Sequence, residues 1–170
     1  AIHDGFRGHG SVYFYELNTD YMFAESFVEN VPFSINYKED RNSNISRMFY
    51  NSTIRTLPAM INVSPTSMGY LFYGCKYLRE LPEDFGVNWR WDYIWNQTSV
   101  DISRMFSNCF SLRKIPQSFL VKLKSVKPSS SGYLSNGMCN NCCSLDELMN
   151  FPVISHKAIT SNMFANFISY

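Results

Sequence analysis

The sequence predicts an α/β repeat solenoid, in which short helices and short strands stack in layers and irregular inserts separate some of the layers. Three observations lead to this prediction. A short phrase recurs along the chain, each copy joins a helix-like part to a strand-like part, and aromatic residues make up 16% of the 170 residues. Because one copy cannot bury its own apolar face, the copies must stack to form a core.

Composition limits what the chain can be. It is 45% hydrophobic and long enough for one domain with its own core, so folding requires neither disulfides nor a metal. The formal net charge is +1, with 15 basic and 14 acidic side chains. Nucleic-acid binding normally requires a concentrated excess of Lys and Arg, so we expect no nucleic-acid partner. No apolar stretch has the length of a bilayer span, and we expect no membrane segment.

The copies are anchored on a Met-Phe pair or its equivalent. The first residues of these pairs are Met22, Met48, Leu71, Met105, Met138 and Met163. They lie 23 to 34 residues apart, within the range of solenoid repeats. We therefore expect a tail or linker over residues 1–20 and one solenoid of about six units over residues 21–170, with the last unit incomplete.

The first part of each copy has the period of a helix. In ISRMFSNC the apolar residues lie at i, i+3, i+4 and i+7, on one helix face, and they are Ile102, Met105, Phe106 and Cys109. An Asn or Gly such as Asn108 follows the anchor by three residues in five copies. Both residue types tolerate the left-handed conformation that ends helices, so we expect a short helix here.

The second part of a copy reads LRELP, LRKIP or IRTLP. It closes at Pro58, Pro82 or Pro116, and because proline cannot donate a ladder hydrogen bond, we expect a short strand that stops there. Stacking the copies places equivalent residues above one another and predicts a column of phenylalanine rings. The members of this column are Phe23, Phe49, Phe72, Phe106 and Phe164.

The segment MCNNCCSL concentrates three of the five cysteines. Cys139 and Cys142 have the C-x-x-C spacing of zinc sites and redox enzymes. Cys142, however, lies four residues after its anchor, as Cys75 and Cys109 do, and this recurrence favours thiols that pack as small buried hydrophobes. No second C-x-x-C or suitably spaced His pair completes a zinc site, so we predict no metal. The alternative is a cysteine-dependent enzyme or metal-binding protein that uses Cys139, Cys142 and Cys143.

No other pattern indicates catalysis. The sequence has no G-x-S-x-G, no Gly-rich phosphate loop, and no His-Cys or His-Asp arrangement with a suitably placed partner. We therefore predict a protein without enzymatic activity, catalytic residues or cofactor.

The copies resemble the BspA-like leucine-rich repeats, whose units read as a Met-Phe or Ala-Phe pair, a Gly or Asn, a Cys and then Leu-x-x-Ile-Pro. MFSNCFSLRKIP and LFYGCKYLRELP match this pattern closely, whereas MFYNSTIRTLP is one residue short and lacks the Cys, and MCNNCCSLDEL replaces the Phe and lacks the Pro. The resemblance covers residues 21–170 and implies a leucine-rich-repeat-like stack. The irregular spacing and the inserts depart from the family's uniform arrays.

The family occurs in bacterial surface proteins that attach to host tissue or other cells, in parasite surface antigens, and in virion proteins of phages and large viruses. The resemblance therefore implies a display scaffold located on a virion or on an extracellular cell surface. Such a scaffold would bind a protein or glycan, on a host or a neighbouring subunit, for attachment or assembly.

An aromatic insert, GVNWRWDYIWNQTS, follows the third copy. Its large rings alternate, so an extended conformation would place all of them on one face as a partner-binding platform. These residues are Trp89, Trp91, Tyr93 and Trp95. In the alternative arrangement, which the sequence supports equally, the strip packs back on its own coils.

A second insert, FLVKLKSVKPSSSGY over residues 119–133, has a Ser-rich tip and several lysines. It reads as a solvated basic loop, and Lys122 and Lys124 are the candidates if it binds an anionic sugar or lipid instead. Beyond it, the final copy has its helix-like part without a strand-like part. We expect assembly through this open C-terminal repeat, which more chain or a partner subunit would cover.

Overall fold

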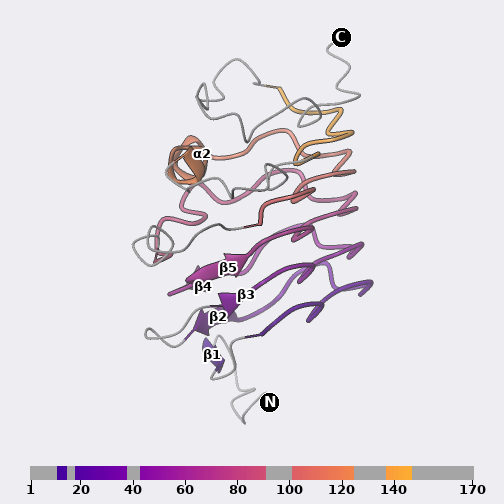
Figure 1. Ribbon diagram of the computed structural model, residues 1–170. Helices are drawn as coiled ribbons and strands as arrows, with labels where there is room; N and C mark the ends of the chain where they lie inside the picture. The colour runs from indigo at the N-terminus through magenta and orange to yellow at the C-terminus, as the bar shows by residue number, and fades with distance from the viewer. Residues whose placement is uncertain (1–10, 15–17, 38–42, 91–100, 125–136, 147–170) are drawn as a thin grey trace.

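The computed structural model describes residues 11–14, 18–37, 43–90, 101–124 and 137–146. Its elements, in chain order, are β1 (Ser11–Phe14), β2 (Ser34–Tyr37), β3 (Ser43–Asn44), β4 (Met60–Ile61), β5 (Pro65–Ser67) and α2 (Gln117–Lys124). Most of the described chain runs as coils that lie one above another from the N-terminal to the C-terminal side (Figure 1).

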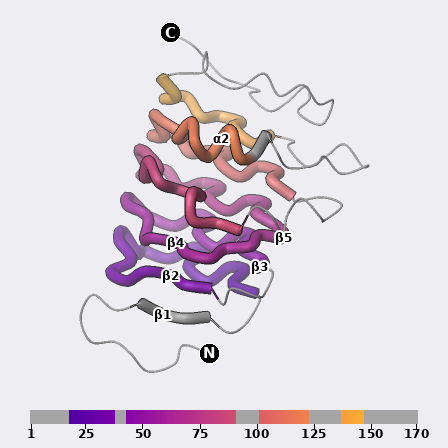
Figure 2. The backbone as a smooth tube through the Cα atoms, turned by 90° about the vertical axis from the view of Figure 1, so that its left-hand side faces the viewer, coloured from indigo at the N-terminus to yellow at the C-terminus, as the bar shows by residue number. Residues whose placement is uncertain are grey.

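Consecutive coils pair in parallel because the chain passes each side of the stack in the same direction. One sheet has the order β1-β2-β4, with Ser11 opposite Ser34 and Ile35 opposite Met60, and the other pairs β3 with β5. Figure 2 shows β1, β2 and β4 one above another. Isolated parallel bridges continue the pairing at Asn18 and Asn44, Asn30 and Thr56, Ser67 and Asp101, and Glu80 and Lys114.

The segments expected to be short helices are tight turns, so the helix prediction for them is wrong. Two left-handed residues, four positions apart, interrupt each of these segments in the described part of the chain, and an α-helix of L-residues cannot include them. The pairs are Tyr21 and Glu25, Arg47 and Asn51, Tyr70 and Gly74, Arg104 and Asn108, and Gly137 and Asn141. The periodic apolar residues still share a face, because consecutive turns bring i and i+3 to the same side.

Main-chain hydrogen bonds explain why turns replace a helix. Within a coil, Tyr50 N donates to Arg47 O at 3.0 Å and Ser52 N donates to Phe49 O at 3.0 Å. The alternate amides donate to the next coil instead, with Phe49 N to Leu71 O at 3.0 Å. A helix would use all of these amides internally and leave none to join the coils.

Phenylalanine rings form the centre of the core. The rings of Phe23, Phe49, Phe72 and Phe106 stack in that order, with centroids 5.4, 5.6 and 5.6 Å apart and planes 11°, 12° and 10° from parallel. The next coil places the buried Cys139 at the equivalent position of the sequence. Phe164, the other expected member of this column, lies outside the described residues, as does the rest of the sixth copy.

The helix α2 corrects the prediction for the second insert, which starts as a helix and not as a loop. The helix follows Pro116, whose carbonyl accepts from Phe119 N at 3.1 Å and from Leu120 N at 3.2 Å. Phe119 and Leu120 are buried. The helix α2 has 8 residues and is too short to cross a membrane. No helix in the described part of the chain is long and apolar enough to do so.

Some residues of the segment expected to be a tail or linker contact the stack. Part of the predicted tail, Ser11–Phe14, is strand β1 and pairs with β2. Thr19 is buried, its amide donates to Asn44 O at 3.0 Å, and its Oγ1 lies 2.7 Å from the hydroxyl of Tyr37. The stack therefore begins before residue 20, where the sequence shows no recognisable copy.

Candidate partner-binding surfaces

Trp89, the first ring of the aromatic insert, lies in the core and not on a surface. Its side chain is 5% exposed, and its indole Nε1 donates to Met60 O at 3.1 Å. The ring meets Phe85 at 5.0 Å and Phe119 at 5.8 Å, both edge to face. For this residue the alternative holds, in which the insert packs back on the coils. The other members of the predicted platform, Trp91, Tyr93 and Trp95, lie outside the described residues.

The predicted basic patch is on or beyond α2. Lys122 is exposed on this helix, and Lys124 is its last residue. Residues 125–133 of the same insert lie outside the described ranges. The described part of the insert therefore presents the exposed Lys122 on a helix whose Phe119 and Leu120 are buried.

Three buried cysteines form a row that links neighbouring coils. The thiol of Cys75 donates to Phe49 O at 2.9 Å, that of Cys109 to Phe72 O at 3.0 Å, and that of Cys142 to Phe106 O at 3.0 Å. Each thiol thus reaches back to the phenylalanine carbonyl of the preceding coil. Ser52 begins the row, and its hydroxyl lies 3.7 Å from the sulfur of Cys75.

Burial makes the thiols of Cys75, Cys109 and Cys139 poor nucleophiles. It raises the pKa of Cys75 to about 12, although hydrogen bonds from Ser52 partly oppose the shift. Burial also raises the pKa of Cys109 and of Cys139 well above the usual value. Cys143 is exposed, and all five cysteines are free thiols. Among the described residues, no group of three or more His, Cys, Asp or Glu side chains is placed to hold a metal.

A row of alternating tyrosine and arginine side chains runs along the turns, and we call it the tyrosine–arginine ridge. Its members are Tyr21, Arg47, Tyr70 and Arg104, which occupy the first left-handed position of successive turns. The guanidinium carbon of Arg47 lies 5.3 Å from the ring centroid of Tyr21 and 5.1 Å from that of Tyr70. The guanidinium carbon of Arg104 lies 5.7 Å from the ring centroid of Tyr70, so Tyr70 contacts an arginine on each side. These distances are typical of cation–π contacts.

Two more tyrosines widen the ridge. The rings of Tyr50 and Tyr73 stack with centroids 5.1 Å apart, and the ring of Tyr70 tilts against both of them. Tyr21 is 54% exposed. The sequence prediction did not include this surface. The sequence does contain a signal for it, since the residue before the anchor alternates between Tyr and Arg in the first four copies and is Gly137 in the fifth.

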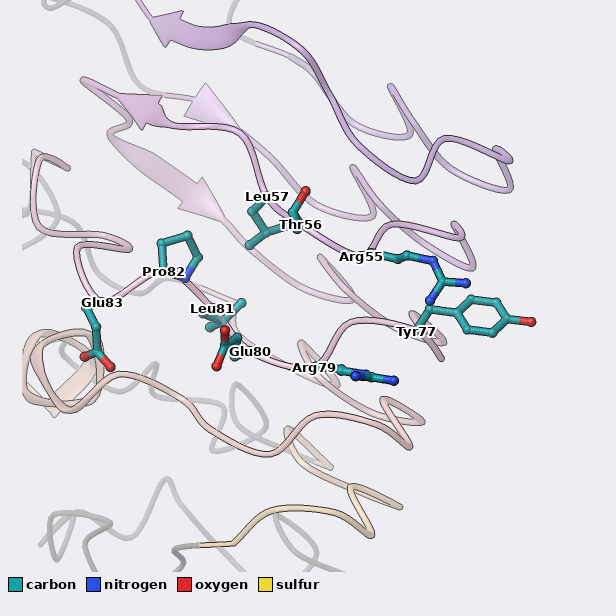
Figure 3. A pocket seen from close by; sticks show the side chains of 9 residues that line it. All are labelled: Arg55, Thr56, Leu57, Tyr77, Arg79, Glu80, Leu81, Pro82 and Glu83. Carbon is teal, nitrogen blue, oxygen red and sulfur yellow. The ribbon is translucent and has the colours of Figure 1, made fainter.

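A second row, of charged residues, lies on the strand-like side. Its members follow the first aliphatic residue of each strand-like part and are Glu29, Arg55, Arg79, Arg113 and Asp146. At its ends, Arg55 Nε lies 3.4 Å from a Glu29 carboxylate oxygen and Arg113 Nε lies 3.1 Å from a carboxylate oxygen of Asp146. A groove of about 510 Å³ opens beside this row, between residues 55–57 and residues 77–83 (Figure 3).

Comparisons with protein-family models, with curated proteins and with solved structures found no significant match to this chain.

Proposed function

We propose that this chain is a non-enzymatic binding module built on a leucine-rich-repeat-like solenoid. In this proposal it is displayed on a virion or a bacterial cell surface, and it holds a protein or glycan partner for attachment or assembly. The resemblance of the repeated phrase to BspA-like units supports this class. The tyrosine–arginine ridge is the observation that carries the binding role.

The ridge has the chemistry of a recognition surface. Tyrosine and arginine, together with tryptophan, are enriched at the energetic centres of interfaces, because each offers a large contact area together with a polar group. A tyrosine ring also offers a flat apolar face on which a sugar ring can lie. Since consecutive coils repeat these side chains, the ridge presents several such groups in a row.

The ridge is also ordered before any partner arrives. Tyr70 N donates to Ser103 O at 2.8 Å and Arg47 N donates to Gly69 O at 3.0 Å, so the backbone beneath the ridge is held by neighbouring coils. Arg47 is held further by Asp20, whose carboxylate oxygen lies 3.8 Å away. Ordered side chains lose little conformational entropy on binding, which favours affinity.

A glycan array and whole bacterial cells test the proposal. The Tyr70→Asn variant removes the central ring of the ridge, and Asn accepts the left-handed backbone at this position. We expect the wild-type chain to bind and Tyr70→Asn to lose about tenfold or more in affinity. The control variant Lys76→Asn changes an exposed side chain of the same coil and should bind as the wild type does.

Two results would contradict the proposal in different ways. Equal binding by the wild type and Tyr70→Asn would remove the ridge from the binding surface. A folded wild-type chain that binds neither the array nor the cells would remove the display function itself. A urea titration of each variant confirms that the fold is intact.

A further inference from the structure

The groove beside the charged row lies where two kinds of coil meet. Two residues separate Asn51 from Ile54, whereas three separate Gly74 from Leu78 and Asn108 from Leu112. The coils before the groove thus have the shorter connection and those after it the longer one. In the coil that follows the groove, the additional residue of the connection lies at Lys76 or Tyr77.

This change in length interrupts the main-chain ladder. On the strand-like side, Arg55 N donates to Glu29 O at 2.8 Å, Arg113 N to Arg79 O at 2.7 Å, and Asp146 N to Arg113 O at 3.0 Å. Within the described residues no such bond joins Arg79 N to Arg55 O. Coils whose connections have equal length pair here, whereas the two coils with unequal connections do not, and the groove lies between those two coils.

The groove has a basic, aromatic rim. The side chains of Arg55, Tyr77 and Arg79 extend in the same direction from the coils, with Tyr77 between the two arginines (Figure 3). The guanidinium carbon of Arg55 lies 5.0 Å from the Tyr77 ring centroid. Tyr77 is 47% exposed, so much of the ring faces solvent.

Arg79 carries the charge that the row leaves unbalanced. The neighbours Arg55 and Arg113 each have a carboxylate partner, Glu29 and Asp146 respectively. Arg79 lies between these two cations and has no acidic partner among the described residues. A carboxylate from outside the chain would find a planar donor there that can make two parallel hydrogen bonds.

The inner part of the groove accepts hydrogen bonds. Glu80 and Thr56 line it, and the Thr56 hydroxyl already donates to the Asn30 side chain, so its oxygen remains an acceptor. Glu83 lines the far end and pairs with Lys114. A ligand that suits this lining therefore combines an anionic group for Arg79 with hydroxyl donors for Glu80 and Thr56.

We infer that this groove binds a carboxylate-bearing saccharide such as a uronic acid unit. Its carboxylate contacts Arg79, its apolar ring face lies on the part of Tyr77 that Arg55 does not cover, and its hydroxyls donate to Glu80 and Thr56. The inference rests on the proposed binding function and adds a ligand class and a second site, separate from the tyrosine–arginine ridge.

Titration with methyl glucuronide, followed by ligand-observed NMR on the full chain, tests the inference. We expect binding of methyl glucuronide and at least about tenfold weaker binding of methyl glucoside, which lacks the carboxylate. Arg79→Gln should abolish the preference for the acid, and Tyr77→Ala should weaken both sugars whereas Tyr77→Phe should retain them. Arg113→Gln is the matched control, because it alters the same row outside the groove and should preserve the preference.

Several results would overturn the inference. These are equal binding of acid and neutral sugar, binding of a sulfated glucoside in place of the glucuronide, and unchanged binding by Arg79→Gln. The Tyr70→Asn variant separates this site from the ridge, since it should bind the glucuronide as the wild type does. Equal array binding by the wild type and Tyr70→Asn, together with intact glucuronide binding, would contradict the ridge alone. Array binding that depends on Tyr70, without glucuronide binding, would contradict the groove alone.

Discussion

At the scale of single residues, the left-handed positions decide which side chains a turn accepts. The second such position holds Asn in three of the coils, and Asn141 Nδ2 donates to Asn108 Oδ1 at 2.7 Å, so the carboxamides bond from coil to coil. Glu25 and Gly74 occupy this position in the other two described coils. A β-carbon on Gly74 would lie 1.9 Å from the Asn51 Oδ1, so glycine leaves the space that the carboxamide occupies.

We predict that Gly74→Ala destabilises the protein more than Gly137→Ala. Both positions have positive φ, +72° and +64°, so both substitutions carry backbone strain of about 1 kcal/mol. Only Gly74→Ala also displaces Asn51, since the nearest atom to a β-carbon on Gly137 is Arg104 Cγ at 3.4 Å. Urea unfolding measures both losses, and the Asn51→Ala background should remove the difference. Equal losses in the wild-type background would refute this account of Gly74.

The buried thiols predict a loss of stability in alkaline solution. Because the pKa of Cys75 rises from 9.0 to about 12 on folding, the unfolded chain releases this proton at lower pH than the folded chain does. The free energy of unfolding should therefore be independent of this group below pH 9. It should fall as pH rises from 9 towards 12, by about 1.4 kcal/mol per pH unit for the Cys75 thiol.

Cys75→Ser provides the comparison for this pH dependence. The serine hydroxyl can donate to Phe49 O as the thiol does, and it does not titrate in this range. The variant should therefore show a shallower alkaline decline in urea titrations over the same pH range. A wild-type slope that matches the variant's would contradict a raised pKa of Cys75 in the folded chain.

At the scale of elements, α2 shows how packing selects a helix within a segment whose composition suggests a loop. The helix holds Phe119 against an aromatic cluster, at 4.8 Å from the Phe85 ring and 6.5 Å from the Phe106 ring. In Figure 1, α2 lies on the same side of the stack as β2 and β4 and nearer the C-terminal end. Most of its stability comes from its contact with the aromatic cluster, because isolated helices of this length are marginal in water.

We predict that Phe119→Ala costs about 3–5 kcal/mol, as deletion of a fully buried aromatic side chain usually does. Val121→Ala on the same helix should change the stability by less than about 0.5 kcal/mol, because Val121 is 49% exposed. Thermal or urea unfolding of the two variants provides the test. Similar effects at both positions would indicate that α2 does not pack on the aromatic cluster.

At the scale of the whole molecule, neighbouring coils depend on one another for both hydrogen bonds and core contacts. Phe72 illustrates this dependence, since its ring stacks on Phe49 and Phe106 from the two adjacent coils and also contacts Phe85. Each coil also donates its alternate turn amides to the coil that follows. Damage to one coil is therefore expected to weaken its neighbours, as in repeat proteins where stability resides in the interfaces.

We predict that Phe72→Ala costs about 3–5 kcal/mol and that Phe23→Ala costs less than half as much. Phe72 is fully buried between two rings, whereas Phe23 is partly exposed and stacks on Phe49 alone among the described rings. Native-state hydrogen exchange should show faster exchange of the Phe49 and Phe106 amides in Phe72→Ala. Unchanged exchange at these two amides would mean that the coils are independent.

The amino-acid sequence by itself determined the rows of equivalent residues. The spacing of the Met-Phe pairs placed Phe23, Phe49, Phe72 and Phe106 in one column, and those rings stack. It also indicated that Cys75, Cys109 and Cys142 share one position, and these thiols form one row. Such rows are readable because each coil repeats the same requirement for an apolar or small side chain at the same place.

Only the tertiary structure decided between helix and turns, and only it revealed the two surfaces. Apolar residues at i, i+3 and i+4 share a face in either conformation, and the choice depends on whether the amides bond within a coil or to the next one. The ridge depends on side chains 23 to 34 residues apart that meet across coils. The groove depends on a one-residue difference between the connections of two coils. This difference has a structural effect only because the two coils are neighbours in the stack. The pattern within one copy does not specify how side chains of different coils contact each other on the outside of the stack, and those contacts set both surfaces.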